Sequence, residues 1–526
     1  QAYFSYDSKK SGGFTCSHLR FGDHPIRSTY LVTTPNFVAC HVQAYLHMYD
    51  VTRGLRKNGT FLLNTIWEGE ELAKNLPNKV KKYFAENNIT VYYINATKIA
   101  QEIGLGNRTN TILQSAFFRI TGVIPVDLAV EQMKKFIVKS YGKKGEDVVN
   151  KNYAAVDRGG EYKQLTVDPA WASLEVEAAA ANNDPAFINE VVRPINAQDG
   201  DLLPVSAFKG IEDGTWHQGT AKYEKRGVAA FVPVWNEANC IQCNQCAFVC
   251  SHATIRPFML SEDEVKAAPA NIKLADTKPK ASEYKYTMSV SPLDCMGCGE
   301  CITVCPVGAI EMVPQESQAE EQPVFDYLVA NVGKKPGMPA DNTVKGSQFN
   351  QPLLEFSGSC AGCAETSYAR LITQLFGEHM YISNATGCSS IWGGPAATSP
   401  YTVNKDSNKG PAWANSLFED NAEHGLGMQI GQEVLRDQAI ASAEKCASSD
   451  KASAELKDAF AKFMETKQDT KANTPATEAL VAELEKAAAA GCPDAKAALE
   501  KKDYLAKKSV WIFGGDGWAY DIGFGG

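Results

Sequence analysis

Eight cysteines near the middle of the chain have the types and spacing of iron ligands. They fall in two runs of the form Cys-x2-Cys-x2-Cys-x3-Cys, namely Cys240, Cys243, Cys246 and Cys250, then Cys295, Cys298, Cys301 and Cys305. Three thiolates of such a run lie in one tight loop and hold one 4Fe-4S cluster, while the fourth ligates the other cluster. The two runs therefore predict two 4Fe-4S clusters and a path for electrons.

The usual cross-ligation rule assigns the ligands of each cluster. One cluster would be held by Cys240, Cys243, Cys246 and Cys305, and the other by Cys295, Cys298, Cys301 and Cys250. We expect Gly297 and Gly299 to let backbone amides approach the cluster sulfurs. Two zinc sites are the alternative, but eight cysteines in this doubled spacing, without partner histidines, favour iron.

Three further cysteines form a group downstream. Cys360 and Cys363 are separated by Ala-Gly, and Cys388 follows in the sequence Ala-Thr-Gly-Cys-Ser-Ser. Three thiols do not complete a four-sulfur site, so a fourth ligand would come from Cys446, from Cys492 or from beyond residue 526. Spacing alone also leaves a redox dithiol or half of a zinc site open.

An acidic turn follows the apolar segment 509–513, which we expect to be a buried strand. The turn reads Gly515-Asp516-Gly517. Asp516 could bind Mg²⁺, a hard cation, and the flanking glycines would let the backbone approach a pyrophosphate closely. In isolation, Asp-Gly after a strand is more often an ordinary turn.

Alternating strand and helix patterns precede the cysteines. Residues 29–32, 60–66 and 90–94 have the composition of strands, and residues 110–120 and 125–141 have helical spacing. This alternation predicts a parallel α/β unit.

Later segments are less regular. We expect a boundary where the pattern breaks between residues 143 and 171, a short helix over 171–181, and a connecting arm rich in Pro, Gly and Asp. The 44 residues from 251 to 294 exceed what a minimal two-cluster module needs and predict an insertion. Residues 421–508 predict a helical hairpin or small bundle, with breaks at 448–450, 473–475 and 491–493.

These patterns predict a multidomain α/β chain with four parts. They are an α/β domain (1–175), a connecting arm (176–215), a ferredoxin-like α+β module with two clusters (216–322), and an α/β domain with a helical insertion (323–526).

Composition narrows the setting of the protein. The 526 residues carry a net charge of −9, and no uninterrupted apolar run is long enough to span a membrane. We therefore expect no nucleic-acid or membrane partner and a soluble protein. The 15 cysteines sit mostly in Cys-x-x-Cys groups, which favours a reducing cytoplasm over disulfides. Cys16, Cys40, Cys446 and Cys492 are expected to be packed free thiols.

Taken together, the motifs resemble the 2-oxoacid:ferredoxin oxidoreductases, most closely the long single-chain pyruvate:ferredoxin oxidoreductases. Nearly the whole chain takes part, and both of its ends look like cuts within a longer protein. The segments that carry the resemblance are 17–22 (SHLRFG), 37–41 (FVACH), 223–227 (YEKRG), the two cysteine runs, 357–365 (SGSCAGCAE), 385–390 (ATGCSS) and 515–518 (GDGW).

The resemblance implies thiamine diphosphate, Mg²⁺ and a third 4Fe-4S cluster. The implied Mg²⁺ ligand is Asp516, with Gly515, Gly517 and Trp518 beside the pyrophosphate. The implied ligands of the third cluster are Cys360, Cys363 and Cys388, with a fourth cysteine beyond residue 526, and the implied neighbours of the thiamine are Glu365 and the Cys388 loop. Residues 323–526 would be the first part of the thiamine-binding domain, and residues 1–175 a gamma-like domain. No residue is assigned as the catalytic acid or base.

The resemblance also implies an activity, namely the oxidative decarboxylation of pyruvate with coenzyme A to acetyl-CoA and CO₂. Electrons would pass through three clusters to ferredoxin or flavodoxin, in a protein expected to be a homodimer. Two alternatives stay open: a non-catalytic iron–sulfur subunit that only relays electrons, and the same chemistry on another 2-oxoacid.

Overall fold

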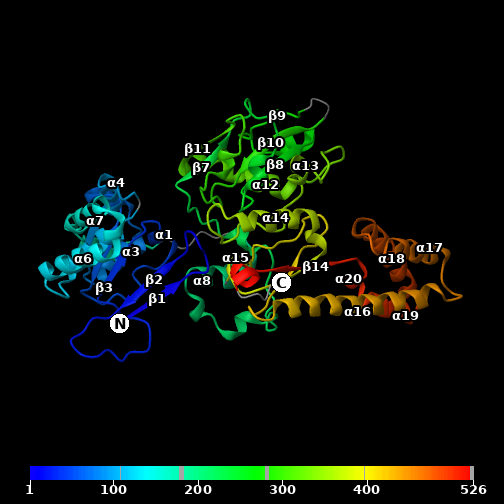
Figure 1. The fold of residues 1–526 in the computed structure, drawn as a ribbon, viewed down its shortest axis with the longest axis horizontal. Helices are drawn as coiled ribbons and strands as arrows, with labels where there is room; N and C mark the ends of the chain where they lie inside the picture. Colours follow the sequence, from blue (N-terminus) through cyan, green and yellow to red (C-terminus); the bar gives the residue numbers. More distant parts are fainter. Residues whose placement is uncertain (107, 177–182, 279–282, 396, 522–526) are drawn as a thin grey trace. The chain divides into compact units, whose positions relative to one another are not determined.

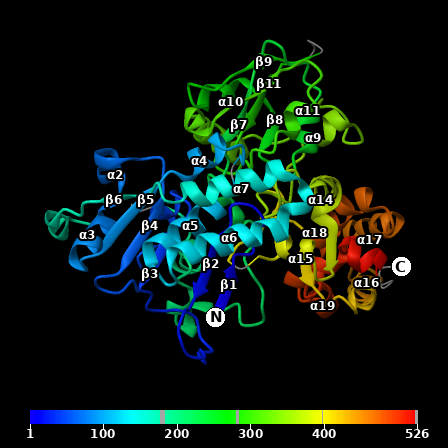
Figure 2. The same cartoon turned by 60° about the vertical axis from the view of Figure 1, so that its left-hand side comes forward.

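The computed structural model describes residues 1–106, 108–176, 183–278, 283–395 and 397–521 (Figures 1 and 2). The chain divides into two compact units. The first unit contains residues 1–5, 15–185 and 193–203, and the second contains residues 6–14, 186–192 and 204–526. The four domain boundaries drawn from the sequence are finer than this division and stay a prediction.

The first unit is built on a mixed four-stranded sheet. Its order is β3 (Phe37–Cys40), β4 (Thr60–Asn64), β5 (Thr90–Ile94), β6 (Lys163–Leu165), with the first three strands parallel and β6 antiparallel to β5. Strand β4 is buried on both faces, because Phe61 and Leu63 enter one hydrophobic core and Leu62 enters another. A strand covered on both faces has an unbroken apolar sequence, as β4 does. The parallel α/β expectation is confirmed for this sheet.

Seven α-helices accompany this sheet. They are α1 (Tyr45–Met48), α2 (Gly69–Asn75), α3 (Asn78–Glu86), α4 (Ala96–Glu102), α5 (Asn110–Thr121), α6 (Val126–Tyr141) and α7 (Glu146–Arg158). The two helices expected around residues 110–120 and 125–141 are confirmed as α5 and α6. Helices α5, α6 and α7 pack against one another (Figure 2). A separate two-stranded sheet pairs β1 (Ala2–Tyr6) with β2 (Thr15–Leu19).

Two expectations for this unit are wrong. Residues 29–32 form no strand, because side chains bind their backbone: Arg20 donates to the carbonyls of Tyr30 and Leu31. The region 143–171 is also not a simple break, since it contains α7 and β6. Helix α7 buries only a narrow stripe of side chains that includes Ala155 and Val156. Most of its other positions are polar or charged, so the sequence shows no clear helical spacing of apolar residues.

Where the structure describes the connecting segment, it forms short helical turns. They are 3-10 helices at Pro169–Ser173, Gly200–Leu202, Val205–Phe208 and Thr220–Tyr223, a π-helix at Ile188–Val192, and α8 (Arg193–Asn196). The helix expected over 171–181 is reduced to the turn at Pro169–Ser173, and its remainder lies partly at 177–182, outside the described residues.

The second unit contains an internal repeat around the cysteine runs. The first run lies among β7 (Phe231–Trp235), α9 (Gln245–Val249) and β8 (Ile255–Leu260), and the second among β10 (Lys285–Val290), α11 (Glu300–Thr303) and β11 (Ile310–Pro314). Strand β7 pairs with β11, and β8 pairs with β10, both antiparallel. Each strand of one half therefore pairs with a strand of the other half. This pairing brings the two cysteine loops into one module.

The extra length between the cysteine runs lies between β8 and β10. It contains α10 (Glu262–Ala267) and β9 (Ala275–Asp276), which pairs with β10. Ser261 and Glu264 form a capping box that starts α10. Helix α12 (Glu321–Asn331) then follows a 3-10 turn at Gln315–Gln318 and packs against this insertion through Val324 and Leu328.

A parallel three-stranded sheet occupies the rest of the second unit. Its order is β13 (Ala412–Asn415), β12 (Met380–Asn384), β14 (Ser509–Phe513), and it confirms the strand expected at 509–513. The other elements around it are α13 (Val344–Ser347), α14 (Ala364–Phe376), a 3-10 turn at Gly377–His379, α15 (Cys388–Gly393) and a π-helix at Gly517–Asp521. Because all three strands point the same way, the loops that follow them meet at one edge.

The helical bundle expected over 421–508 is confirmed, with the long α16 visible in Figure 1. It comprises α16 (Asn421–Ala447), α17 (Ala454–Thr466), α18 (Thr470–Ala489), α19 (Pro493–Leu499) and α20 (Lys502–Leu505). The break expected at 473–475 is wrong, because α18 passes through Pro475. Asp469 caps α18 through the amides of Lys471 and Ala472, so the helix begins five residues before Pro475 and continues although proline cannot donate to Lys471 O.

Candidate functional site

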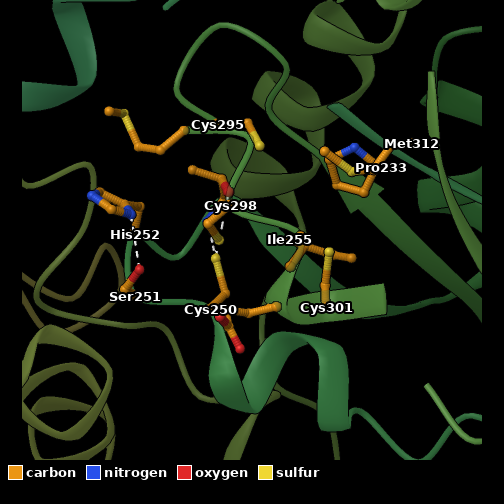
Figure 3. Close-up of a pocket in the computed structure, with 13 residues that line it drawn as sticks. Pro233, Cys250, Ser251, His252, Ile255, Cys295, Cys298, Cys301 and Met312 are labelled. Carbon is orange, nitrogen blue, oxygen red and sulfur yellow. Dashed lines mark hydrogen bonds between the residues drawn. The ribbon is translucent and has the colours of Figure 1, made fainter. Parts of the chain in front are cut away.

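Eight cysteines line two pockets in the repeat module. Cys240, Cys243, Cys246 and Cys305 line one pocket, which we call the first cysteine pocket. Cys250, Cys295, Cys298 and Cys301 line the other, which we call the second cysteine pocket (Figure 3). These are the two cross-ligated sets expected from the spacing.

Each pocket receives its fourth cysteine from the other half of the repeat. Cys250 is the residue after α9, and Cys305 lies two residues after α11. The antiparallel pairs β7 with β11 and β8 with β10 carry these residues across the module. The exchange of ligands is therefore a consequence of strand pairing.

The geometry suits a cluster better than a single ion. In the described part of the chain, no three His, Cys, Asp or Glu side chains converge closely enough to bind one metal ion. Zinc needs four ligands that meet within about 2.3 Å of one point, whereas a 4Fe-4S cluster occupies the space between separated thiolates. Four cysteines around a pocket fit the cluster.

Backbone amides already point at several of these sulfurs. The amides of Gln242 and Ala309 donate to Cys240 Sγ and Cys305 Sγ at 3.3 and 3.2 Å. In the second pocket, Gly297 N donates to Cys295 Sγ at 3.4 Å. Such bonds stabilise thiolates and help to set cluster potentials.

Burial makes the bare thiols weak acids. It raises the pKa of Cys295 and of Cys301 to about 12, and it also raises the pKa of Cys246. Without iron these thiols are protonated near neutral pH, so ligation must release their protons.

The loop of the third cysteine group packs on the second cysteine pocket. A Cβ added to Gly362 would lie 3.6 Å from the Cβ of Cys298. Cys363 is the residue before α14, and Cys388 is the first residue of α15. Cys360 and Cys388 are exposed, and Cys363 is half-buried.

Neither Cys446 nor Cys492 can complete this third group. The Asn421 amide at the start of α16 donates to Phe513 O at 3.1 Å, which fixes that end of the helix to the end of β14. Cys446 lies 25 positions further along α16, which is about 38 Å at 1.5 Å per residue. Cys492 contacts Cys446 and shares its position at the far end.

A buried histidine connects the second cysteine pocket with the third cysteine loop. His252 Nδ1 shares a hydrogen bond with Ser251 Oγ at 3.0 Å, directly after Cys250 (Figure 3). Its Nε2 lies 3.1 Å from Ser359 O and 3.0 Å from Ser359 Oγ, directly before Cys360. Burial lowers the pKa of His252 to about 4, so a neutral ring joins the two loops. No sequence pattern indicates this role, because the eight histidines are scattered along the chain.

The motif Glu224-Lys225-Arg226 braces the second cysteine run. Lys225 Nζ lies 2.6 Å from Asp294 Oδ2, directly before Cys295, and Arg226 Nη2 lies 3.6 Å from Met296 Sδ, directly after it.

The same motif reaches the N-terminal segment of the second unit. Glu224 pairs with the buried Lys9 at 3.0 Å, and Arg226 Nη1 donates to Ser11 O at 2.7 Å. Lys10 N donates to Gly358 O at 2.8 Å, beside the third cysteine loop. The motif therefore contacts both residues 9–11 and the second cysteine run, and residues 9–11 in turn contact the third cysteine loop.

The C-terminal edge of the parallel sheet brings the remaining candidates together. The Cys388 loop follows β12, and Gly515, Asp516 and Gly517 follow β14. Glu365, in the first turn of α14, accepts a hydrogen bond from Trp392 Nε1 at 3.2 Å. Burial raises the pKa of Glu365, the Trp392 bond lowers it, and the nearby Asp516 charge raises it. The charge of Asp516 therefore acts on Glu365 at this edge of the sheet.

Several buried polar atoms of this region have no hydrogen-bond partner among the described residues. They are Asn384 Oδ1, Ser389 Oγ, Tyr401 OH, Trp413 Nε1 and Trp518 Nε1. Unpaired buried polar groups are costly. Such atoms beside Asp516 and Glu365 fit a polar cofactor with a bound hard cation. Trp518 packs on Gly514, where an added Cβ would lie 2.2 Å from the indole.

The region 239–309 matches the family model described as a 4Fe-4S dicluster domain. Residues 1–162 match the model "Pyruvate ferredoxin/flavodoxin oxidoreductase", and residues 173–229 match a domain of unknown function named EKR. Fold and site thus define an iron–sulfur protein in which an α/β unit accompanies a two-cluster module. No described helix is both long enough and apolar enough to cross a membrane.

Curated relatives align with the whole chain. It is 50% identical to "Pyruvate-flavodoxin oxidoreductase" of Klebsiella pneumoniae over 530 residues and 49% identical to "Pyruvate:ferredoxin oxidoreductase" of Moorella thermoacetica over 537 residues. It is 40% identical to mitochondrial "Pyruvate dehydrogenase [NADP(+)]" of Euglena gracilis. The chain spans 45% of the length of the first two relatives and 29% of the third. The resemblance to pyruvate:ferredoxin oxidoreductases is confirmed.

Proposed function

We propose that the chain is the electron-exit part of a pyruvate:ferredoxin oxidoreductase, which oxidises pyruvate with coenzyme A to acetyl-CoA and CO₂ and passes electrons to ferredoxin or flavodoxin. The observation that carries the proposal is the packing of the Cys360–Cys363 loop on Cys298. This contact brings the loop of Cys360 and Cys363 against the second cysteine pocket.

In this proposal the chain's residues have separate tasks. Asp516 would hold Mg²⁺, with Gly515 and Gly517 beside the pyrophosphate and Glu365 and Trp518 bordering the thiamine. Thiamine diphosphate, when bound, supplies the carbanion chemistry of decarboxylation. Three 4Fe-4S clusters would accept single electrons, and the fourth ligand of the third cluster would come from a residue other than Cys446 or Cys492.

Electrons would leave at the first cysteine pocket. Its lining includes Ile241 and Val307, which are 46% and 39% exposed. Lys278 Nζ donates to Cys240 O at 2.8 Å, and Lys285 is exposed nearby on β10. An apolar patch flanked by cations suits an acidic electron carrier, which it would attract before docking. We infer that ferredoxin or flavodoxin docks here, with the whole protein a homodimer in the cytoplasm.

The experiment is a cofactor count on anaerobically purified full-length protein. About twelve irons per chain, from three clusters of four, together with one thiamine diphosphate, would support the enzyme. About eight irons without thiamine would instead identify an electron-relay subunit. Turnover of other 2-oxoacids in preference to pyruvate would keep the chemistry and change the substrate.

A variant tests the cation site separately. Asp516→Ala should lower the retention of Mg²⁺ and thiamine diphosphate while leaving the iron of the two cysteine pockets unchanged, because it lies outside both pockets. Asp503→Ala, at an exposed carboxylate on α20, is the matched control. Unchanged thiamine retention in Asp516→Ala would remove this residue from the site.

A further inference from the structure

The helical bundle contains two thiols that neither cysteine pocket uses. The Sγ atoms of Cys446 and Cys492 lie 3.0 Å apart. Cys446 is buried near the end of α16, and the partly exposed Cys492 is the N-cap of α19. The sequence presented them as two unrelated packed thiols, because 45 residues separate them. Only the packing of α16 against α19 makes them a pair.

We propose that Cys446 and Cys492 form a redox-active dithiol, which small disulfides oxidise to a disulfide that staples α16 to α19. The surroundings hold both residues in place. Ala443 and Ala447 on α16 pack with Ala495 and Ala498 on α19, and all four are buried. Small side chains at this contact let the two helices approach closely enough for the sulfurs to meet.

The two thiols are chemically unequal. Cys492 Sγ accepts a hydrogen bond from Ala495 N at 3.5 Å, in the first turn of α19. The Cys446 thiol and the helix amides lower the pKa of Cys492, whereas burial raises the pKa of Cys446 to about 12. The more exposed and more acidic thiol is the better attacking group. Cys492 is therefore the attacking thiol, and Cys446 is the resolving thiol.

The reaction balances with a low-molecular-weight disulfide as the oxidant. The Cys492 thiolate attacks one sulfur of the disulfide, forms a mixed disulfide and releases one thiolate. Cys446 then loses its proton, attacks Cys492 Sγ and releases the second small thiolate. The sum is one protein disulfide formed, one small disulfide reduced to two thiols, and the two protein thiol protons transferred to those thiols.

The bond would add a covalent link between α16 and the chain that leads into β14. Hydrogen bonds already connect them, among them that from Arg436 Nε to Leu505 O at 2.9 Å. Asn473 Oδ1 accepts from Lys507 N at 2.8 Å and lies 3.4 Å from Arg436 Nη2. Cys446 lies ten positions beyond Arg436, about 15 Å along the helix. Oxidation should therefore protect α19 and α20 from local opening.

The test uses the full chain with its clusters loaded and equilibrates it anaerobically with mixtures of reduced and oxidised glutathione. Free thiols are then alkylated, and peptides are mapped by mass spectrometry. We expect a peptide that links Cys446 to Cys492, two fewer alkylated cysteines, and full reversal by dithiothreitol. Absence of the linked peptide at every ratio would overturn the proposal.

Variants assign the two roles. Cys446→Ser should trap glutathione on Cys492, whereas Cys492→Ser should leave Cys446 without an adduct. The matched control is Cys40→Ser, which removes a buried thiol of the first unit and should keep the linked peptide. An adduct on Cys446 but none on Cys492 would contradict the assignment.

Hydrogen exchange of the wild-type protein tests the staple without any variant. Amides of α19 and α20 should exchange at least several-fold more slowly in the oxidised than in the reduced protein. Equal exchange rates would show that the disulfide forms without stapling the bundle, and would overturn that part of the proposal. Neither measurement depends on pyruvate turnover, so its failure is distinct from a failure of the proposed function.

Discussion

The two cysteine pockets share one spacing but are stabilised in different ways. In the second run Gly297 and Gly299 take left-handed backbone conformations, with φ of +68° and +80°. The matching positions of the first run, Gln242 and Asn244, take the same conformation without being glycine, with φ of +60° and +62°. Left-handed backbone costs about 1 kcal/mol or more outside glycine. The ligand loop therefore requires two left-handed residues. The second run uses glycine at both positions, whereas the first run uses Gln242 and Asn244.

Side-chain hydrogen bonds hold the first loop. Gln242 donates to Asp276 O at 2.7 Å and accepts from Lys278 N at 2.8 Å. Asn244 donates to Lys345 O and accepts from Tyr286 OH, both at 2.8 Å. The second loop is instead held from outside, by Lys225 and Arg226 on one side and by His252 on the other. The first loop is thus held by hydrogen bonds of its own side chains, and the second by side chains from other segments of the chain.

The largest expected effect is loss of one cluster. An alanine Cβ at residue 297 would lie 2.9 Å from Phe231 O and 3.1 Å from Ala229 Cβ. Gly297→Ala should therefore lose about four irons per chain, measured by iron and sulfide analysis. Gly299→Ala is the control, because no atom lies within 4 Å of its added Cβ. Equal iron loss in both variants would mean that φ alone, and not the close approach, decides loading.

The second-largest effect is expected from removing the ion pair between Lys225 and Asp294, which should destabilise the second pocket. Lys225→Met leaves the Asp294 carboxylate, which is 3% exposed, without its main cation. Breaking a buried ion pair in this way costs about 3 kcal/mol, measured by denaturant unfolding of the second unit. Lys222→Met, at an exposed lysine in the same turn, should cost less than about 0.5 kcal/mol. Similar losses in both would refute the brace.

The histidine bridge should have an intermediate effect. His252→Phe keeps an aromatic ring but removes the hydrogen bonds of the imidazole with Ser251 and Ser359, at a cost of about 2 kcal/mol. Magnetic coupling between the reduced clusters should also weaken, since the bridge spaces the two cysteine loops. His24→Phe, at an exposed histidine, should change neither. If the variant loses stability but the magnetic coupling stays unchanged, His252 contributes only to packing.

The smallest effect is expected in the first pocket. Tyr286→Phe removes only the hydroxyl that supports Asn244 Oδ1, at a cost of about 1 kcal/mol. Iron content should stay unchanged, because three other side-chain hydrogen bonds still hold the loop. Denaturant unfolding and iron analysis of the same samples check both statements. Loss of iron from Tyr286→Phe would show that the first loop is no more robust than the second.

Local patterns predicted much of the fold. Strands β4, β5 and β14 and helices α5 and α6 were recognisable from apolar spacing, since their burial is regular. Residues 29–32 were misread as a strand, because distant Arg20 binds the carbonyls that a neighbouring strand would have paired. Helix α7 was missed because its buried stripe is narrow. In the first case a side-chain contact outweighed local preference, and in the second the apolar signal was too weak to recognise.

The sequence by itself determined the metal-ligand chemistry, because cysteine spacing fixes how many thiolates one short loop can present. The tertiary structure alone decided which distant groups meet. It paired Cys446 with Cys492, brought Trp392 to Glu365, and placed His252 between two cysteine loops. Ligand spacing is a local property of the backbone, whereas these encounters depend on how strands pair and helices pack. Local sequence patterns do not predict how these strands pair and these helices pack.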